Sequence, residues 1–182
     1  MIRALAPIVI LIFLSSCGSP DVNIKKSDHF NGKVFYNLNE PKLQNSFKDF
    51  LKWRFGSTRE DWPKWVDIQQ KKVLKQRVKK GELSISFINH ATTLIQIDGV
   101  NILTDPVYSK RTSPLSFAGP KRVKLPGIKF EDLPKIDLIL ISHNHYDSFD
   151  VKTLDKLIKR DNPKILFGLG NSYYLNKKNE TT

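Results

Sequence analysis

Apolar and polar residues alternate in the middle of the chain, in the pattern that half-buried β-strands show. The first such strand is expected over 83–88 and two more over 93–97 and 100–104. Asp98-Gly99 separates the last two, and this pair is a strong signal for a two-residue hairpin turn. The pattern therefore predicts three consecutive strands.

Before these strands the apolar residues follow a helical period. The spacing over 47–55 predicts a helix that ends at Gly56, and a second helix is expected from a cap at Asp61 to Gly81. Three aromatic residues of this region are expected to serve as packing residues, with a membrane-interface belt as the alternative: Trp53, Trp62 and Trp65.

After the hairpins, strand and helix patterns alternate. The most apolar strand is expected over 136–142, fit for burial on both faces. A helix over 151–160, a strand over 164–167 and the start of a helix over 171–176 follow it. Strands followed by alternating helix and strand place the chain in the α/β class.

Composition excludes a disordered chain, because 40% of the 182 residues are hydrophobic and 26% are charged. The net charge of +12 is high, but lysine is spread along the whole chain. Such a distribution is typical of a solvated basic surface, and it also suits attraction to anionic lipid headgroups. No nucleic-acid motif accompanies the charge, so we expect no nucleic-acid partner.

The N-terminal residues predict an address outside the cytoplasm. Arg3 precedes an apolar run over 4–14 that is too short to span a bilayer as a mature helix. Leu14-Ser15-Ser16-Cys17 then resembles a bacterial lipobox, and Cys17 is the only cysteine. We expect lipidation at Cys17 and a location in the bacterial cell envelope, lipid-anchored at the periplasmic face of the outer membrane. An ordinary cleaved signal peptide or an uncleaved anchor is the alternative.

These patterns divide the chain into four expected parts. A lipoprotein signal peptide with its lipobox is followed by a polar tether, then by an arm with helices, and last by the strand-rich domain. The corresponding residues are 1–17, 18–27, 28–80 and 81–182.

Two histidines and an aspartate follow the most apolar strand in the run His143-Asn144-His145-Tyr146-Asp147. Residues two apart in an extended segment point to one side, so His143 and His145 can bind one cation. Asp147, in the following turn, can reach a second ion or orient a bound water. Imidazole and carboxylate suit zinc, with iron or manganese as alternatives. A chance pair of surface histidines is the other interpretation, but α/β proteins place ligands at this end of a strand.

The loop Ile141–Asp147 resembles the zinc loop of the metallo-β-lactamase superfamily. Within it, the chain is most similar to the branch that contains N-acylphosphatidylethanolamine-hydrolysing phospholipase D and its bacterial relatives. The resemblance covers roughly 28–175, and these further segments carry it: His29-Phe30-Asn31-Gly32, Asn89-His90-Ala91-Thr92, Leu103-Thr104-Asp105-Pro106-Val107, Ser113-Pro114, Gly119-Pro120-Lys121-Arg122 and Leu133-Pro134-Lys135-Ile136-Asp137.

The resemblance implies a partial αββα sandwich, mainly the first sheet and its helix. It implies that His143 and His145 bind a first zinc, and that Asp147 is catalytic and binds a second. His90 would support the site, and Asp105 would orient a ligand from behind. For His90 and Asp105, a purely structural role in capping or turning their strands is the alternative.

The family chemistry is hydrolysis, in which a hydroxide that bridges two zinc ions attacks phosphorus or a carbonyl carbon. The branch implies a phospholipid-like substrate, here N-acyl phospholipids. A phosphorylated sugar lactone or another phosphodiester is the alternative substrate class.

Two departures from the family pattern change this expectation. Ser148 stands where the family loop supplies a further histidine, and no histidine follows Leu175. We therefore expect one zinc ion or none, and a chain that is inactive alone. A truncated or split member with a decayed reading frame is the expected origin. A separate chain would then supply the missing half, and the inner face of the first sheet would be exposed. The alternative is a non-catalytic lipoprotein remnant that binds membrane or a partner.

Overall fold

The computed structural model describes residues 24–39, 46–56, 61–72, 75–115 and 117–179. The chain divides into two compact units, Met1–Glu40 and Pro41–Thr182. Cys17, the predicted signal peptide and most of the predicted tether lie outside the described residues.

In the first unit, Phe30 is buried and stacks on Phe35 with ring centroids 4.3 Å apart. Backbone bridges join Phe30 to Ser27 and to Phe35. These contacts form a small turn structure within the expected arm, and the boundaries of that arm stay a prediction.

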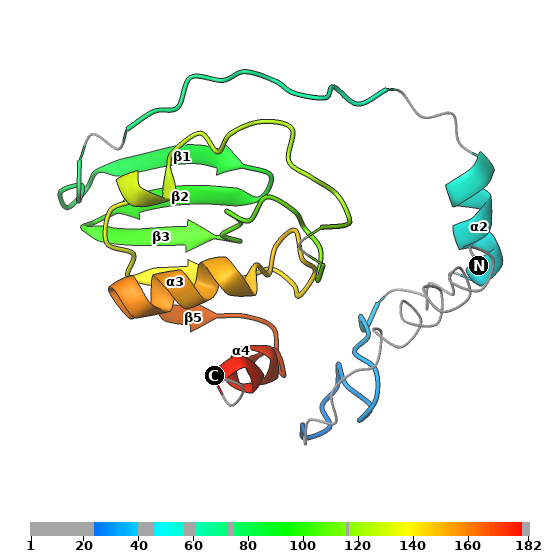
Figure 1. Cartoon of the computed structure of the whole chain (residues 1–182). Coiled ribbons are helices and arrows are strands. Elements are labelled where there is room, and N and C mark those ends of the chain that lie inside the picture. The colour runs from blue at the N-terminus through cyan, green and yellow to red at the C-terminus, as the bar shows by residue number, and fades with distance from the viewer. Residues whose placement is uncertain (1–23, 40–45, 57–60, 73–74, 116, 180–182) are drawn as a thin grey trace. The chain divides into compact units, whose positions relative to one another are not determined.

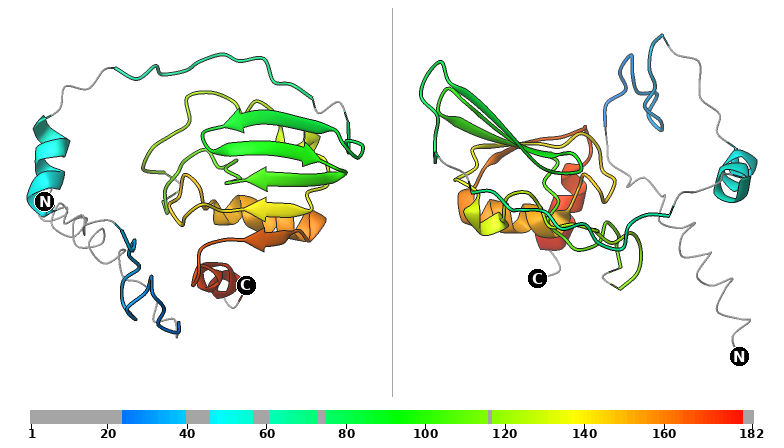
Figure 2. Two further views of the ribbon diagram at one scale, coloured as in Figure 1. Left: turned by 180° about the vertical axis from the view of Figure 1, so that it is seen from behind. Right: turned by 90° about the horizontal axis from the view of Figure 1, so that it is seen from above.

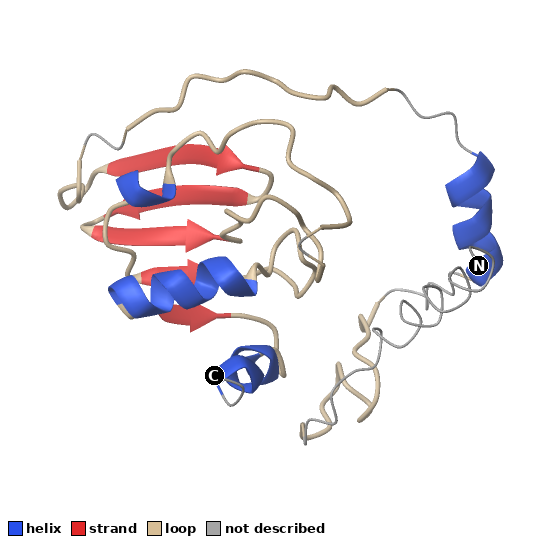
Figure 3. Cartoon of the chain, viewed as in Figure 1, coloured by secondary structure: helices blue, strands red, loops and turns tan. Residues whose placement is uncertain are grey.

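The second unit contains a mixed five-stranded sheet in the order β1-β2-β3-β4-β5 (Figures 1 and 3). β1, β2 and β3 are antiparallel neighbours, whereas β4 and β5 join in parallel. The elements of this unit are α2 (Phe47–Gly56), β1 (Leu83–Asn89), β2 (Thr92–Ile97), β3 (Val100–Thr104), η1 (Phe130–Asp132), β4 (Leu138–Leu140), α3 (Val151–Asp161), β5 (Lys164–Leu166) and α4 (Ser172–Asn179). The α/β class and the three predicted hairpin strands are confirmed.

The β2–β3 turn shows why the sequence signal worked. Asp98 and Gly99 both have positive φ, at 50° and 81°. A two-residue turn of this kind needs positive φ at both central positions, which aspartate tolerates and glycine adopts freely.

The core lies between one face of the sheet and α3. Leu94, Leu103 and Ile139 point to this side from three strands, and Leu154 and Leu157 of α3 meet them; all five are fully buried. The helix begins at an N-cap aspartate, Asp150, whose side chain accepts the backbone N–H of Thr153, and ends at Asn162 in the left-handed conformation.

The opposite face of the sheet is apolar and exposed, and we call it the open face. Leu83, Ile85 and Phe87 on β1 are 60%, 63% and 60% exposed. The strand register aligns them with a continuous set on the neighbouring strands: Ile95, Ile97, Val100, Ile102, Leu138, Leu140 and Leu166. Seen from behind, no described helix of this unit covers the sheet (Figure 2, left). This agrees with the exposed inner face that the resemblance led us to expect.

The predicted helix from Asp61 to Gly81 is wrong, because none of its described residues is helical. The backbone N–H groups of Val66 and Lys71 donate instead to the carbonyls of Val123 and Gly127, at 2.6 and 2.7 Å. A peptide that donates to a distant segment cannot also close a helical turn.

The tryptophan prediction is also wrong. Trp53, Trp62 and Trp65 are 61%, 78% and 46% exposed, so they are not core residues. The helix predicted over 47–55 is confirmed as α2, and its aromatic side chains are likewise exposed. None of the described helices is long and apolar enough to cross a membrane.

The strand expected over 136–142 is shorter than predicted. β4 comprises only Leu138–Leu140, and Leu138 and Leu140 on the open face are half-buried, so burial on both faces is incomplete. Ile136 and Ile141, which flank β4, are nevertheless buried in the core.

Candidate metal centre

The sheet topology brings the predicted site residues to one end of the sheet. β1, β3 and β4 run in the same direction, since β1 and β3 are both antiparallel to β2 and β4 is parallel to β3. His90 follows β1, Asp105 follows β3, and the segment from His143 to Asp147 follows β4. Ligand sites of α/β proteins lie at this carboxyl end of the strands.

His143, His145 and Asp147 form the candidate centre. One ligand atom from each lies within 4.8 Å of the others. The two imidazole rings are 4.7 Å apart between centroids and inclined at 75°. Both histidines are exposed and Asp147 is half-buried, so the centre opens to solvent. The structure therefore brings together the three residues that the sequence singled out.

This donor set fits a zinc ion. Two nitrogen ligands at about 2.1 Å from a tetrahedral zinc are about 3.4 Å apart. The candidate ligand atoms lie within 4.8 Å of one another, so side-chain rotations that move them by roughly an ångström would bring them to this separation. Two imidazoles and a carboxylate are a hydrolytic ligand set, and they leave positions for water or further ligands.

The first histidine is oriented by its neighbour. The hydroxyl of Ser142 lies 2.8 Å from Nδ1 of His143. The contact occupies Nδ1 and leaves Nε2 of His143 for a metal, as hydrogen-bonded partners of metal-binding histidines commonly do. Ser142 lies in the predicted metal loop but was not among the predicted site residues.

Asp105 holds the start of the metal loop by hydrogen bonds to the backbone of that loop. Its carboxylate accepts the N–H of Ser142 at 2.7 Å, and its own N–H donates to the carbonyl of Leu140 at 2.8 Å. The hydroxyl of Thr92 donates to the Asp105 carbonyl at 2.6 Å. Among the described contacts, this buried aspartate thus fixes the loop backbone and touches no predicted metal ligand.

His90 contacts the third ligand directly. Its Nε2 lies 3.1 Å from a carboxylate oxygen of Asp147. Both side chains are substantially exposed, at 61% and 42%, so the pair contributes little to folding stability. It can, however, hold the Asp147 carboxylate in one orientation. The structure thus places His90 beside Asp147, and its supporting role stays a prediction.

Both His90 and Asp105 have a left-handed backbone, with φ of 40° and 36°. Such a conformation is uncommon for residues with a Cβ, although Asn, Asp and His adopt it more often than others. It turns the chain sharply at the ends of β1 and β3.

The far end of the loop is tied into the core. The N–H groups of Ser148 and Phe149 both donate to the carbonyl of His145, at 3.0 and 2.6 Å, and both side chains are buried. Asp150 then accepts the N–H groups of Tyr108 and Ser109 at 3.1 and 2.8 Å. The loop is therefore held at both ends while its histidines remain in solvent. Ser148, the departure from the family pattern, occupies an almost fully buried position, 1% exposed.

Beside the loop there is a hollow of about 410 Å³ at the carboxyl ends of β3, β4 and β5. Its lining combines polar groups of Thr104, Asp105 and Ser142 with the apolar side chains of Leu140 and Leu166.

The donor set and the fold are those of an α/β protein that can bind a metal ion, and comparison with known proteins gives the family. Residues 84–181 match the family described as Beta-lactamase superfamily domain. The chain belongs to this family.

Individual relatives are similar over only part of their length. The chain is 36% identical over 153 residues to N-acyl-phosphatidylethanolamine-hydrolyzing phospholipase D 1 of Caenorhabditis elegans, which covers 74% of this chain and 40% of that protein. It is 41% identical over 88 residues to an uncharacterized protein of Mycobacterium tuberculosis, covering 48% of this chain and 24% of the relative. The chain thus spans less than half the length of these relatives.

One solved structure, a metallo hydrolase from the archaeon Ignicoccus hospitalis, matches 53% of this chain and 36% of its own chain. The sequence identity is 21% and the TM-score 0.38.

Proposed function

We propose that this chain is the metal-binding part of a zinc-dependent phosphodiesterase that acts on N-acyl phospholipids or closely related lipids. The observation that carries the proposal is the convergence of His143, His145 and Asp147 within 4.8 Å at the carboxyl end of the sheet. The name of the worm relative supports the substrate class.

Each site residue has a role in this proposal. A bound zinc would supply a Lewis acid and lower the pKa of its water, which makes a nucleophile near neutral pH. His143 and His145 would hold the ion, with His143 oriented by Ser142. Asp147 would bind the ion and orient the attacking water, and His90 would keep its carboxylate turned toward the loop.

The hollow beside the loop suits one part of such a substrate. Leu140 and Leu166 give it an apolar wall next to the polar groups of Asp105 and Ser142. A phosphodiester with an attached apolar group can therefore lie with its phosphorus toward the histidines. The high positive charge of the chain favours approach to anionic lipid headgroups.

We also propose that further polypeptide, continuous with this chain or separate from it, covers the open face and completes the metal centre. The support is the continuous apolar surface from Leu83 on β1 to Leu166 on β5, which is larger than scattered exposed residues would give. The same polypeptide would supply the metal ligands that are missing from the set His143, His145 and Asp147, since Ser148 is a poor zinc ligand. Translating the flanking DNA in every frame would show whether such a segment is encoded nearby.

Zinc binding tests the proposal on the chain itself. Metal-free protein titrated with zinc in a calorimeter should bind the ion near-stoichiometrically, and His143→Ala and His145→Ala should each abolish binding. His29→Ala is the matched control, since this exposed histidine contacts Asp28 and lies in the other unit. Binding that survives both loop substitutions would exclude the loop as the metal centre.

Activity requires the complementing polypeptide. Co-expressed protein should hydrolyse N-acyl phosphatidylethanolamine in mixed micelles faster than bis(p-nitrophenyl) phosphate or a phosphorylated sugar lactone. Faster hydrolysis of the lactone would contradict the hypothesis of a phospholipid substrate. Asp147→Asn is expected to abolish activity toward either substrate.

One observation favours a second candidate, a non-catalytic remnant that binds membrane or a partner. Ser148 replaces a metal-binding side chain with a hydroxyl that is a poor zinc ligand at neutral pH, and it is buried. If the titration shows no zinc binding, this candidate replaces the enzyme.

The envelope location remains a proposal, supported by the lipobox-like sequence at Cys17. Metabolic labelling with a clickable fatty acid should mark the parent chain and leave Cys17→Ser unlabelled. Equal labelling of both would rule out the anchor.

A further inference from the structure

β1 lies at one edge of the sheet, and among the described strands it pairs with β2 alone. No backbone hydrogen bond from another described segment reaches it between Leu83 and Phe87. Immediately beyond, the N–H of Gly127 donates to the carbonyl of Ile88 at 2.7 Å. The outer edge of β1 therefore presents unpaired backbone groups up to the point where Gly127 closes it, and such an edge is a template for another strand.

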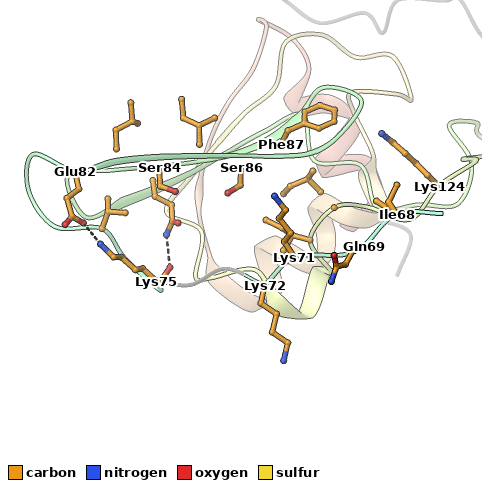
Figure 4. A pocket seen from close by; sticks show the side chains of 17 residues that line it. Ile68, Gln69, Lys71, Lys72, Lys75, Glu82, Ser84, Ser86, Phe87 and Lys124 are labelled. Carbon is orange, nitrogen blue, oxygen red and sulfur yellow. Dashed lines mark hydrogen bonds and ion pairs between the residues drawn. The ribbon is translucent and has the colours of Figure 1, made fainter. Parts of the chain in front are cut away.

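A groove of about 790 Å³ runs along this edge. β1 forms one wall, and Ile68, Lys72 and Lys75 belong to the other, with Lys124 at one end (Figure 4). This second wall is fixed, since the N–H of Lys71 donates to Gly127 and the side chain of Gln96 donates to the carbonyl of Lys75 at 3.0 Å.

The groove is basic. Four lysines line it: Lys71, Lys72, Lys75 and Lys124. Glu82 is the one acidic residue among its described lining residues, and it pairs with Lys75 at 2.9 Å. The ammonium group of Lys124 lies 5.5 Å from the ring centre of Phe87, at the end of the open stretch. A ligand in the groove thus meets excess positive charge.

The two walls differ in what they offer. Figure 4 shows Ser84 and Ser86 directed from β1 toward the side where Lys71 and Lys75 lie. Leu83, Ile85 and Phe87 alternate with them and belong to the open face. A strand added at this edge would therefore place every second side chain among lysines and hydroxyls, and the others beside an apolar row.

We propose that this groove binds an extended acidic segment of a partner protein by strand addition to β1. The segment alternates acidic with β-branched apolar residues. Main-chain hydrogen bonds to β1 supply affinity, and the lysines select the acidic side chains. This site is independent of the metal centre, and its occupant need not be the polypeptide that covers the open face.

Fluorescence anisotropy with a defined probe tests the inference on the full chain. The probe is a fluorescein-labelled peptide of roughly eight residues, alternating valine and glutamate, a length that matches a typical strand. Saturable binding is expected at low salt, with the affinity falling as salt is added. Lys71→Glu with Lys124→Glu should weaken binding by about tenfold or more. Lys129→Glu with Lys152→Glu changes the net charge equally on exposed residues outside the groove and should have little effect.

Two further probes separate strand addition from charge attraction. A peptide in which alternate amides are N-methylated keeps its charge but cannot complete the ladder, so it should not bind. A valine–lysine peptide should not bind either. Equal binding of the N-methylated peptide, equal weakening by both double substitutions, or no binding of the valine–glutamate peptide overturns the proposal. Concentration-dependent self-association that the peptide does not displace would also overturn it, because a second copy would then occupy the edge.

Discussion

Asp150 connects the metal loop, the segment after β3 and the first turn of α3, so its removal should be costly. The carboxylate accepts hydrogen bonds from the N–H groups of Tyr108 and Ser109 and from the hydroxyl of Ser109, at 3.1, 2.8 and 2.9 Å. It also accepts the N–H and the hydroxyl of Thr153, at 3.2 and 2.6 Å. The residue is 6% exposed, so water replaces few of these bonds.

The magnitude for Asp150→Ala follows from which bonds have substitutes. Loss of the N-cap costs about 1 kcal/mol. The N–H of Tyr108 keeps a second acceptor in the hydroxyl of Thr153 at 3.1 Å, whereas the N–H of Ser109 loses its recorded partner. One lost bond to a buried charge costs about 1.5–3 kcal/mol. The total is about 2.5–4 kcal/mol, a large share of the roughly 5–15 kcal/mol typical of a domain.

Equilibrium urea unfolding followed by far-ultraviolet circular dichroism measures this loss. Asp150→Asn keeps one carbonyl acceptor and should lose about half as much free energy of unfolding as Asp150→Ala. Glu131→Ala, at an exposed acidic residue of η1, should change it by no more than about 0.5 kcal/mol. If Asp150→Ala costs no more than the Glu131 control, the carboxylate does not join the loop to the helix as argued.

Four other substitutions test other parts of the molecule. The side chain of Arg77 holds the pKa of Asp137 below its usual range. The stability that this pair contributes is present above the unfolded pKa of about 3.9 and is lost as the pH falls through the lower folded pKa. The loss of unfolding free energy in Arg77→Gln, measured by urea unfolding, should therefore become smaller below about pH 4. Ile85→Lys on the open face should change stability by less than about 0.5 kcal/mol and raise solubility, whereas Leu94→Ala on the buried face should cost about 2–5 kcal/mol; similar costs would contradict the assignment of faces. Ser148→His should tighten zinc binding in calorimetry, although overpacking at this buried position costs about 1–3 kcal/mol, and an unchanged affinity would show that this position does not face the ion.

Local signals in the sequence predicted the elements whose causes are local. The hairpin at Asp98-Gly99 depends on two backbone conformations, and α3 depends on its apolar period and the cap at Asp150, so all of these appear in the structure. The false helix after Asp61 had the right period, but its backbone donates to the segment from Val123 to Gly127, which the sequence does not reveal. Tertiary hydrogen bonds overrode propensity there.

The sequence pointed to the candidate ligands and to His90 and Asp105 beside them, but not to the contacts that hold these residues in place. His143, His145 and Asp147 could be identified because they occupy alternate positions directly after an apolar strand. Their supports are contacts between distant segments, such as the bond from Ser142 to Asp105. The alternation in β1 likewise predicted that one side of the strand is apolar. It did not identify the surface against which that side packs.

The left-handed backbone at His90 and Asp105 costs conformational energy at two positions whose side chains contact the candidate metal loop. Glycine at either position would relieve strain of about 1 kcal/mol, and it would remove the imidazole beside Asp147 or the carboxylate that holds the loop. Each turn therefore keeps a side chain that contacts the candidate metal loop, at a backbone cost that glycine would avoid.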